Sequence, residues 1–195
     1  MNLKKGLSFV AFGFFFTLVN INLTLNGTKL NVTPDFVGWI LFFLAFDCLG
    51  SYTADRKYLK WLSLLLVILS GAVWLYEIAK PELDPGYVKT VIAVGSAAYM
   101  FILFGPLRRI AGDCGSRRAD TIGVLRILDL VLNLGFIALA LLGSARSASA
   151  ITAAALFLGF AALAAAVVTM VTLFQLRREI GAMPDAQVNG KDVQS

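Results

Sequence analysis

Long apolar stretches alternate with short polar segments along the whole chain. A helix of about 20 residues, rising about 1.5 Å per residue, crosses a hydrocarbon core about 30 Å thick, so each stretch is long enough to span a membrane. The six stretches cover roughly residues 7–25, 36–53, 60–78, 87–105, 121–142 and 150–173. This pattern predicts an all-α integral membrane protein, a bundle of six transmembrane helices.

The composition agrees with a membrane location. Hydrophobic residues make up 58% of the 195 residues and charged residues 15%, which leaves too little polar surface for a soluble globular domain. The first stretch follows Lys4 and Lys5, as the apolar part of a signal peptide would. No small-x-small cleavage site comes after it, so we expect it to be retained as a span.

Lysine and arginine residues are unevenly shared between the two sides of the predicted bundle. Thirteen lie on the side that holds both chain ends, and only Lys29, Lys80, Lys89 and Arg146 lie on the other side. Cytoplasmic segments of membrane proteins carry the excess of Lys and Arg, so both termini are predicted to be cytoplasmic. The net charge of +5 is spread over segments next to span ends, which favours anionic lipid headgroups over nucleic acid as its partner.

Two polar segments are predicted to have distinct structures. Residues 20–35 read NINLTLNGTKLNVTPD, in which apolar and polar residues alternate on both sides of an Asn-Gly pair. That pattern is typical of a β-hairpin, here on the outer side between the first two helices. The transmembrane domain is expected to cover residues 1–178, and the polar residues 179–195 to form a disordered cytoplasmic tail.

The third and sixth stretches differ in side-chain size. Residues 61–76 are rich in leucine and other bulky residues, which predicts a helix that faces the lipid. Residues 153–166 are mostly alanine and include Gly159, and such small residues allow helix backbones to approach closely. The sixth helix is therefore expected at the centre of the bundle.

Four polar residues inside the apolar stretches form the candidate substrate- or ion-binding site. Asp47 lies in the second stretch, slightly toward the cytoplasm, and Asp129 lies at a similar depth in the fifth. Arg126, Asp129 and Asn133 are spaced i, i+3 and i+7, so they share one face of a helix. If that face meets Asp47, two carboxyls and one guanidinium form a cluster able to hold a cation or exchange a proton.

A purely structural role for the same residues is the alternative. Arg126 is near enough to the membrane boundary to extend its charge to water, and Asp129 is able to pair with it along one helix. Asn133 is able to hydrogen-bond a neighbouring helix. Asp47 is the hardest to assign in this way, because a short carboxyl cannot reach the boundary and intramembrane acids are functional candidates.

Several classes of site are excluded by what the sequence lacks. The chain has no histidine and two well-separated cysteines, Cys48 and Cys114, so no transition-metal site and no cofactor is predicted. Both cysteines map to the cytoplasmic half, where thiols stay reduced, so a disulfide is not expected. The sequence contains no nucleophile elbow, zinc-protease motif or phosphate-binding loop, and enzymatic activity is not predicted.

The residues that open the second stretch carry a resemblance to known proteins. Residues 34–41 read Pro-Asp-Phe-Val-Gly-Trp-Ile-Leu, after a first span and a short polar hairpin. This N-terminal quarter of the chain resembles uncharacterised small bacterial multi-spanning membrane proteins with a Pro-Asp-Phe-Ile/Val-Gly-Tyr/Trp-Ile-Leu motif in this place. The resemblance implies a multi-pass protein of the bacterial cytoplasmic membrane, and it implies no activity.

Two functions fit these observations. The first is a translocator of a small solute or ion that uses Asp47, Arg126, Asp129 and Asn133. The second is a non-catalytic accessory or scaffold protein of the membrane, in which the same residues only hold helices together. An oligomer is compatible with both.

Overall fold

The computed structural model describes residues 3–18, 22–25, 28–31, 34–49, 56–79, 86–142 and 148–182. The apolar stretches are helical, because a helix bonds its own N–H and C=O groups where no water is present. The elements are α1 (Leu3–Leu18), β1 (Asn22–Leu25), β2 (Thr28–Asn31), α2 (Asp35–Leu49), α3 (Arg56–Ala79), α4 (Gly86–Asp113), α5 (Arg118–Leu142) and α6 (Ala148–Ala182).

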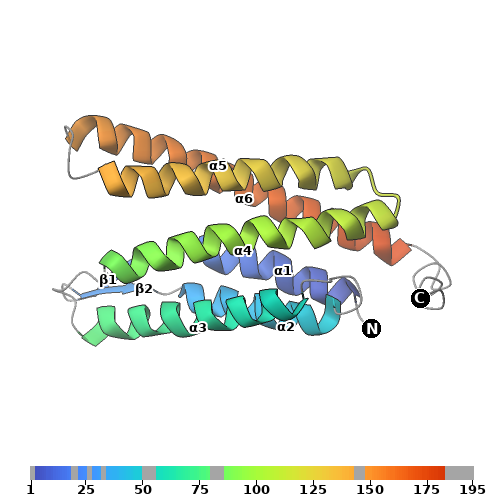
Figure 1. Cartoon of the computed structure of the whole chain (residues 1–195), viewed down its shortest axis with the longest axis horizontal. Helices are drawn as coiled ribbons and strands as arrows, with labels where there is room; N and C mark the ends of the chain where they lie inside the picture. Colours follow the sequence, from blue (N-terminus) through green and yellow to red (C-terminus); the bar gives the residue numbers. More distant parts are fainter. Residues whose placement is uncertain are drawn as a thin grey trace.

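The six helices of the described part run side by side along the long axis of the molecule (Figure 1). Each helix packs against the next one in the chain, and α6 packs against α1, so the helices form a closed ring. In Figure 1, α1 and α4 lie between the α2–α3 pair and the α5–α6 pair. α1 begins and α6 ends at the same end of the bundle.

Aromatic side chains fill the interior of this ring. Phe14 of α1, Phe42 and Phe46 of α2, and Tyr99 and Phe104 of α4 are each at most 2% exposed. The centroid of the Phe42 ring lies 5.4 Å from the ring centroids of both Phe14 and Tyr99, which is a favourable separation for aromatic pairs. The core is therefore centred on α1, α2 and α4.

Four of the described helices are long and apolar enough to cross a membrane, by length and composition. The segments are Lys57–Ala79, Gly86–Asp113, Arg118–Leu139 and Thr152–Ala182. They confirm the coarser prediction of a helical membrane protein. Because α1 and α2 have 16 and 15 residues, they are about 24 and 22 Å long, shorter than a hydrocarbon core of about 30 Å. Six spans therefore stay a prediction.

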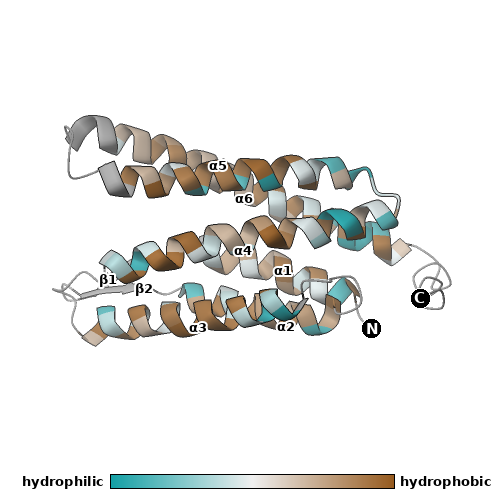
Figure 2. Cartoon of the chain, in the orientation of Figure 1, coloured by the Kyte–Doolittle hydropathy of each residue, from teal (hydrophilic) through white to brown (hydrophobic). Residues whose placement is uncertain are grey.

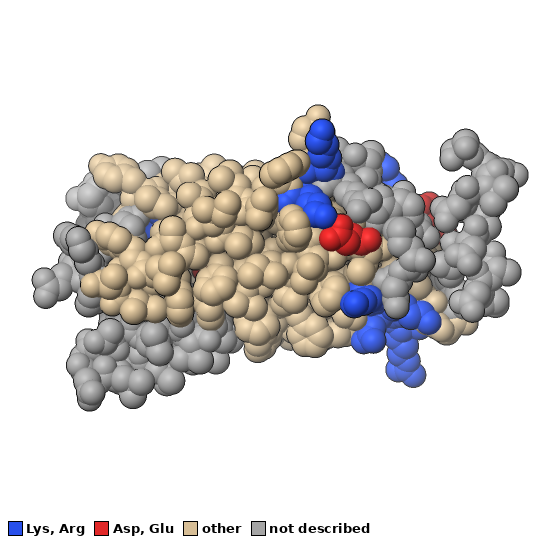
Figure 3. Space-filling view, turned by 90° about the horizontal axis from the view of Figure 1, so that it is seen from below, with Lys and Arg blue, Asp and Glu red and all other residues tan. Residues whose placement is uncertain are grey.

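The surface has the polarity that a membrane requires. Apolar residues line the middle of the helices, and polar residues gather toward the end where α1 begins and α6 ends (Figure 2). On the face shown in Figure 3, uncharged residues cover the middle, and Lys and Arg gather toward the same end. α3 exposes Trp61, Leu65 and Ile68, which agrees with the lipid-facing helix predicted for the third stretch.

Two short segments outside the bundle differ from the helices. β1 and β2 pair antiparallel, with Asn22 opposite Asn31 and Leu25 opposite Thr28. The predicted turn between them, residues 26–27, lies outside the described residues.

At the C-terminal end α6 continues to Ala182, so the predicted tail starts later than residue 179. The remainder of that tail, 183–195, also lies outside the described residues.

The sixth helix does not lie at the centre of the bundle, contrary to the prediction from its small residues. Phe157 and Phe160 are 74% and 72% exposed, and a Cβ atom placed on Gly159 would meet no atom within 4 Å. Small residues allow a close approach but do not select the face on which it occurs. Among the α6 side chains that the structure describes, the buried alanines are Ala165 and Ala166, farther along the helix.

The close approach of two helix backbones is instead found between α1 and α2. A Cβ atom on Gly38 would lie 2.6 Å from Thr17 Cγ2 and 2.8 Å from the backbone oxygen of Gly13. A Cβ atom on Gly13 would lie 2.8 Å from the Phe42 ring. The missing side chains at both glycines therefore allow α1 and α2 to pack at this distance.

Candidate functional site

Asp47 lies on the outer surface of the bundle. Its side chain is 47% exposed, and its Oδ1 accepts a hydrogen bond of 2.6 Å from Lys60 Nζ of α3. The same Nζ lies 4.6 Å from the centroid of the Phe43 ring. Because α2 and α5 lie on opposite sides of the α1–α4 layer (Figure 1), Asp47 does not meet the polar face of α5. Asp47 instead pairs with Lys60, thirteen residues along the chain, a contact that the spacing of the polar residues does not predict.

Arg126 points from α5 toward α4. Its Cζ lies 3.8 Å from the centroid of the Phe101 ring, which is a cation–π contact. Its Nε is buried and has no hydrogen-bond partner among the described residues. No ion pair joins Arg126 to Asp129 in the described part of the chain. The four residues predicted from the sequence are therefore not brought together as one cluster.

Asp129 and Asn133 do lie together, as their spacing predicts. Asn133 Nδ2 donates to Asp129 Oδ2 at 3.1 Å and to the backbone oxygen of Asp129 at 2.8 Å. Both side chains line a cavity of about 220 Å³ between α1, α5 and α6. The small side chains of Ala162, Ala165 and Ala166 on α6 leave room for this cavity, which is large enough for several water molecules or a small solute.

The rest of the cavity wall is apolar apart from one hydroxyl. Phe14 of α1 and Phe136 of α5 are among the apolar lining residues. Thr169 Oγ1 donates to the backbone oxygen of Ala165 at 2.8 Å, so its lone pairs remain available to a second partner. A carboxyl, an amide and a hydroxyl thus face one apolar space. Such oxygen atoms are able to bind a proton, a hard cation or a hydroxyl-bearing solute.

A second polar cavity, of about 280 Å³, lies between α2, α3 and α4. Its wall contains an ion pair of 2.9 Å between Glu77 Oε1 and Lys89 Nζ. Asp35 Oδ1 and Ser70 Oγ, in the same wall, are buried without a hydrogen-bond partner among the described residues. Asp35 precedes the apolar part of α2, and burial together with the nearby Glu77 charge raises its pKa to about 6. From the sequence alone, the position of Asp35 is explained by the helix dipole, because an acidic residue at the start of a helix is favourable there.

We expect Asp35→Asn to stabilise the folded protein at neutral pH. The folded-state pKa of about 6 lies above the ordinary value of 3.8, so the folded state loses stability as the pH rises through this interval. At pH 7 the ionised Asp35 lowers the free energy of unfolding by at most about 3 kcal/mol. Its favourable interaction with the helix dipole offsets about 0.3–1 kcal/mol of this loss. The melting temperature in detergent should therefore rise for Asp35→Asn relative to wild type at about pH 7.5, and the difference should shrink as the pH falls and vanish at about pH 3, below both pKa values.

Asp120→Asn is the control for this measurement, because the Asp120 side chain is 95% exposed. It should follow the wild-type pH dependence. An Asp35→Asn protein with the wild-type pH dependence would contradict the buried, charged state of this carboxyl.

No protein-family model, curated protein or solved structure matches this chain. Among the residues that the structure describes, no group of three His, Cys, Asp or Glu side chains is placed to hold a metal ion. The chemistry of the Asp129–Asn133 cavity therefore follows from its own geometry.

Proposed function

We propose that this protein is a multi-pass membrane protein that translocates a small solute or ion, with Asp129 and Asn133 as its binding site. One observation carries the proposal: the Asp129 carboxyl lines a cavity of about 220 Å³ enclosed by three helices. Carboxyls inside membrane spans are rare and energetically expensive, and they commonly mark substrate or ion pathways.

The depth of Asp129 supports this role. It lies eleven residues from Arg118 and thirteen from Leu142, the two ends of α5, so it is about 17 Å from one end and about 20 Å from the other. A carboxylate at this depth is far from bulk water, so its charged form is costly. The hydrogen bond from Asn133 satisfies part of its acceptor capacity, and a bound proton or cation would neutralise its charge.

The absence of a fixed counterion also supports exchange of a ligand at Asp129. Asp47 is paired with the ammonium group of Lys60, so that carboxyl already has a cationic partner within the protein. Among the described residues, Asp129 has no ion pair with a Lys or Arg side chain. Its carboxyl is therefore available to a mobile cation or proton.

The alternative is a non-catalytic accessory or scaffold protein in which the Asp129–Asn133 pair is only structural. One observation favours it: both hydrogen bonds donated by Asn133 stay within α5. Hydrogen bonds within one helix satisfy part of the hydrogen-bonding capacity of Asp129 and Asn133 without any ligand. Under this alternative, neutralising Asp129 leaves both the fold and the activity of the protein intact.

The proposal includes six spans, with both termini in the bacterial cytoplasm. α1 and α2 pack in the same ring as the four long apolar helices. Lys and Arg gather toward the end where α1 begins and α6 ends (Figure 3), and cytoplasmic ends carry this excess. The bacterial cytoplasmic membrane is proposed from the resemblance of residues 34–41 to bacterial multi-spanning proteins.

Flux into liposomes tests the proposed function. The purified protein is reconstituted, and uptake of protons, Na⁺, K⁺ and a panel of small polar solutes is measured. We expect flux from the wild type and a rate at least about tenfold lower from Asp129→Asn, because a hydrogen bond to a charged group contributes about 1.5–3 kcal/mol. Asp47→Asn is the matched control, since it removes a carboxyl that is paired at the surface, and it should keep the wild-type rate.

Melting temperatures of all three proteins are recorded in parallel, so that an unfolded variant is recognised. Wild-type protein without flux across the panel would reject translocation and support the accessory-protein alternative. Equal flux from the wild type and folded Asp129→Asn protein would exclude Asp129 as the binding group.

A further inference from the structure

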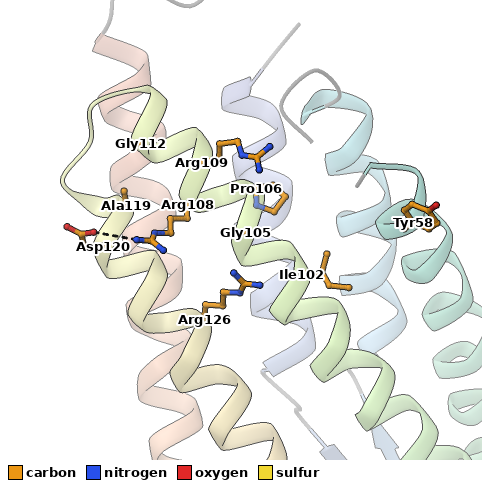
Figure 4. Close-up of a pocket in the computed structure, with 10 residues that line it drawn as sticks. All are labelled: Tyr58, Ile102, Gly105, Pro106, Arg108, Arg109, Gly112, Ala119, Asp120 and Arg126. Atoms are coloured by element: carbon orange, nitrogen blue, oxygen red, sulfur yellow. Dashed lines mark ion pairs between the residues drawn. The ribbon is translucent and has the colours of Figure 1, made fainter. Parts of the chain in front are cut away.

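An open cleft of about 840 Å³ lies beside α4, near the end of the bundle where α4 and α5 are joined (Figure 4). Arg108 and Arg109 enter it from the last part of α4, and Arg126 enters it from α5. Gly105 and Pro106 line the cleft as well. Because these two residues have no long side chains, they leave the space beside the arginines open.

The cleft holds more positive charge than the protein itself neutralises. Three guanidinium groups line it, together with one carboxylate, that of Asp120. Arg108 Nη2 lies 3.9 Å from Asp120 Oδ1, and the two side chains are 57% and 95% exposed, so this ion pair is weak. In the described part of the chain, no carboxylate pairs with Arg109 or Arg126.

The Arg126 side chain contacts an aromatic ring, but its buried Nε–H group has no hydrogen-bond acceptor among the described residues. The Phe101 ring contacts its guanidinium at 3.8 Å and offers no hydrogen-bond acceptor of the oxygen or nitrogen type. The Nε atom is buried and has no partner among the described residues, although buried donors in proteins normally have one. An anion in the cleft would pair with this guanidinium, whose hydrogen bonding is incomplete among the described residues.

The cleft continues into an apolar groove along α5. The groove, about 700 Å³, shares Arg108, Asp120 and Arg126 with the cleft and is otherwise lined by a glycine and apolar side chains. Ile127 and Val131 in this groove are 56% and 58% exposed. They follow Arg126 along α5 toward the middle of the predicted span. The positively charged cleft is therefore directly continuous with an apolar groove.

We infer that this cleft binds the phosphate group of an anionic membrane lipid. Arg109 and Arg126 contact the phosphate oxygens, and the lipid chains lie along the Ile127–Val131 groove. Guanidinium groups present paired N–H donors that match the geometry of a phosphate. A free phosphate ion would use the arginines but would leave the apolar groove unused. The inference is independent of transport at Asp129, because the two sites lie in different cavities.

Lipid binding to the purified full-length protein in neutral detergent tests this inference. Dioleoylphosphatidylglycerol and dioleoylphosphatidylcholine have the same chains and differ in headgroup charge, and inorganic phosphate is the third ligand. Bound lipid is measured by native mass spectrometry, with the shift in melting temperature as a second readout. We expect phosphatidylglycerol to bind the wild type at least about tenfold more tightly than phosphatidylcholine or inorganic phosphate.

Three arginine variants locate the binding. Arg109→Gln and Arg126→Gln should each weaken phosphatidylglycerol binding by about tenfold. Arg178→Gln is the matched control, because Arg178 is exposed on α6 and does not line the cleft, and it should bind as the wild type does. If the loss of the Phe101 contact prevents Arg126→Gln from folding, the exposed Arg109 decides the result.

Equal binding of the two lipids, or unchanged binding in both cleft variants, would overturn the inference. Arginine-dependent binding of inorganic phosphate with the affinity of the lipid would overturn the lipid assignment and identify a soluble phosphate ligand instead.

Discussion

Replacing Gly38 by leucine is expected to abolish folding, whereas replacing Gly159 by leucine is expected to leave the protein folded. A Cβ atom at position 38 would lie 2.6 Å from Thr17 Cγ2 and 2.8 Å from the backbone oxygen of Gly13. Thr17 is held by its own hydrogen bond to that oxygen, at 3.0 Å, and the backbone of α1 cannot move without separating from α2. Adding side-chain atoms to a well-packed site lowers the free energy of unfolding by about 1–3 kcal/mol. Because the added atoms here would clash with backbone, we expect a loss above the lower end of that range.

The yield of monodisperse protein from size-exclusion chromatography in mild detergent measures this effect. Gly38→Ala, which adds only the clashing Cβ atom, should give a lower melting temperature than the wild type. Gly159→Leu should melt close to the wild type, because a Cβ atom there meets nothing within 4 Å. Similar losses at both positions would show that the α1–α2 approach is not what makes Gly38 necessary.

A cysteine introduced at Tyr87 should be labelled almost completely by a membrane-impermeant maleimide added to intact cells, and one at Arg117 should not be labelled. Tyr87 is 93% exposed near the start of α4, and Arg117 is exposed just after its end. The two positions lie at opposite ends of one helix of 28 residues, which is about 42 Å long. The pattern of labelling therefore reports which end of the bundle faces outward.

The native cysteines, Cys48 and Cys114, are replaced by alanine in this experiment, so that only the introduced thiol reacts. Permeabilised cells should label both positions and serve as the control for reactivity. Labelling of Arg117→Cys alone in intact cells would reverse the proposed orientation. Labelling of both positions in intact cells would contradict a membrane-spanning α4.

The apolar stretches were a sound guide to the helices but not to their ends. The third to sixth stretches correspond to α3–α6. The fourth stretch was predicted to end near residue 105, yet α4 continues through Pro106 to Asp113. Hydrophobicity marks the part of a helix that lies in lipid, and it does not mark where the backbone hydrogen bonding stops.

The orientation of α2 could not be predicted from its residues. Positions 36–46 contain no polar side chain, so no face of this helix is distinguished by polarity. In the structure, Phe42 and Phe46 face the core, whereas Asp47 faces outward and pairs with Lys60. Lipid accepts the same apolar side chains as a protein interior does, and hydrophobicity therefore does not select the buried face of a membrane helix.

Features that depend on residues close along the chain are predictable from the sequence. The apolar lengths of the helices and the Asp129–Asn133 pair belong to this class, because backbone geometry alone brings positions i and i+4 together. Tertiary packing sets which faces meet: Arg126 with Phe101, Gly38 with Gly13, and Asp129 with the cavity beside α6. The rotation of each helix about its axis is set by packing against its neighbours, and in a membrane that packing depends on side-chain shape rather than on an apolar stripe in the sequence.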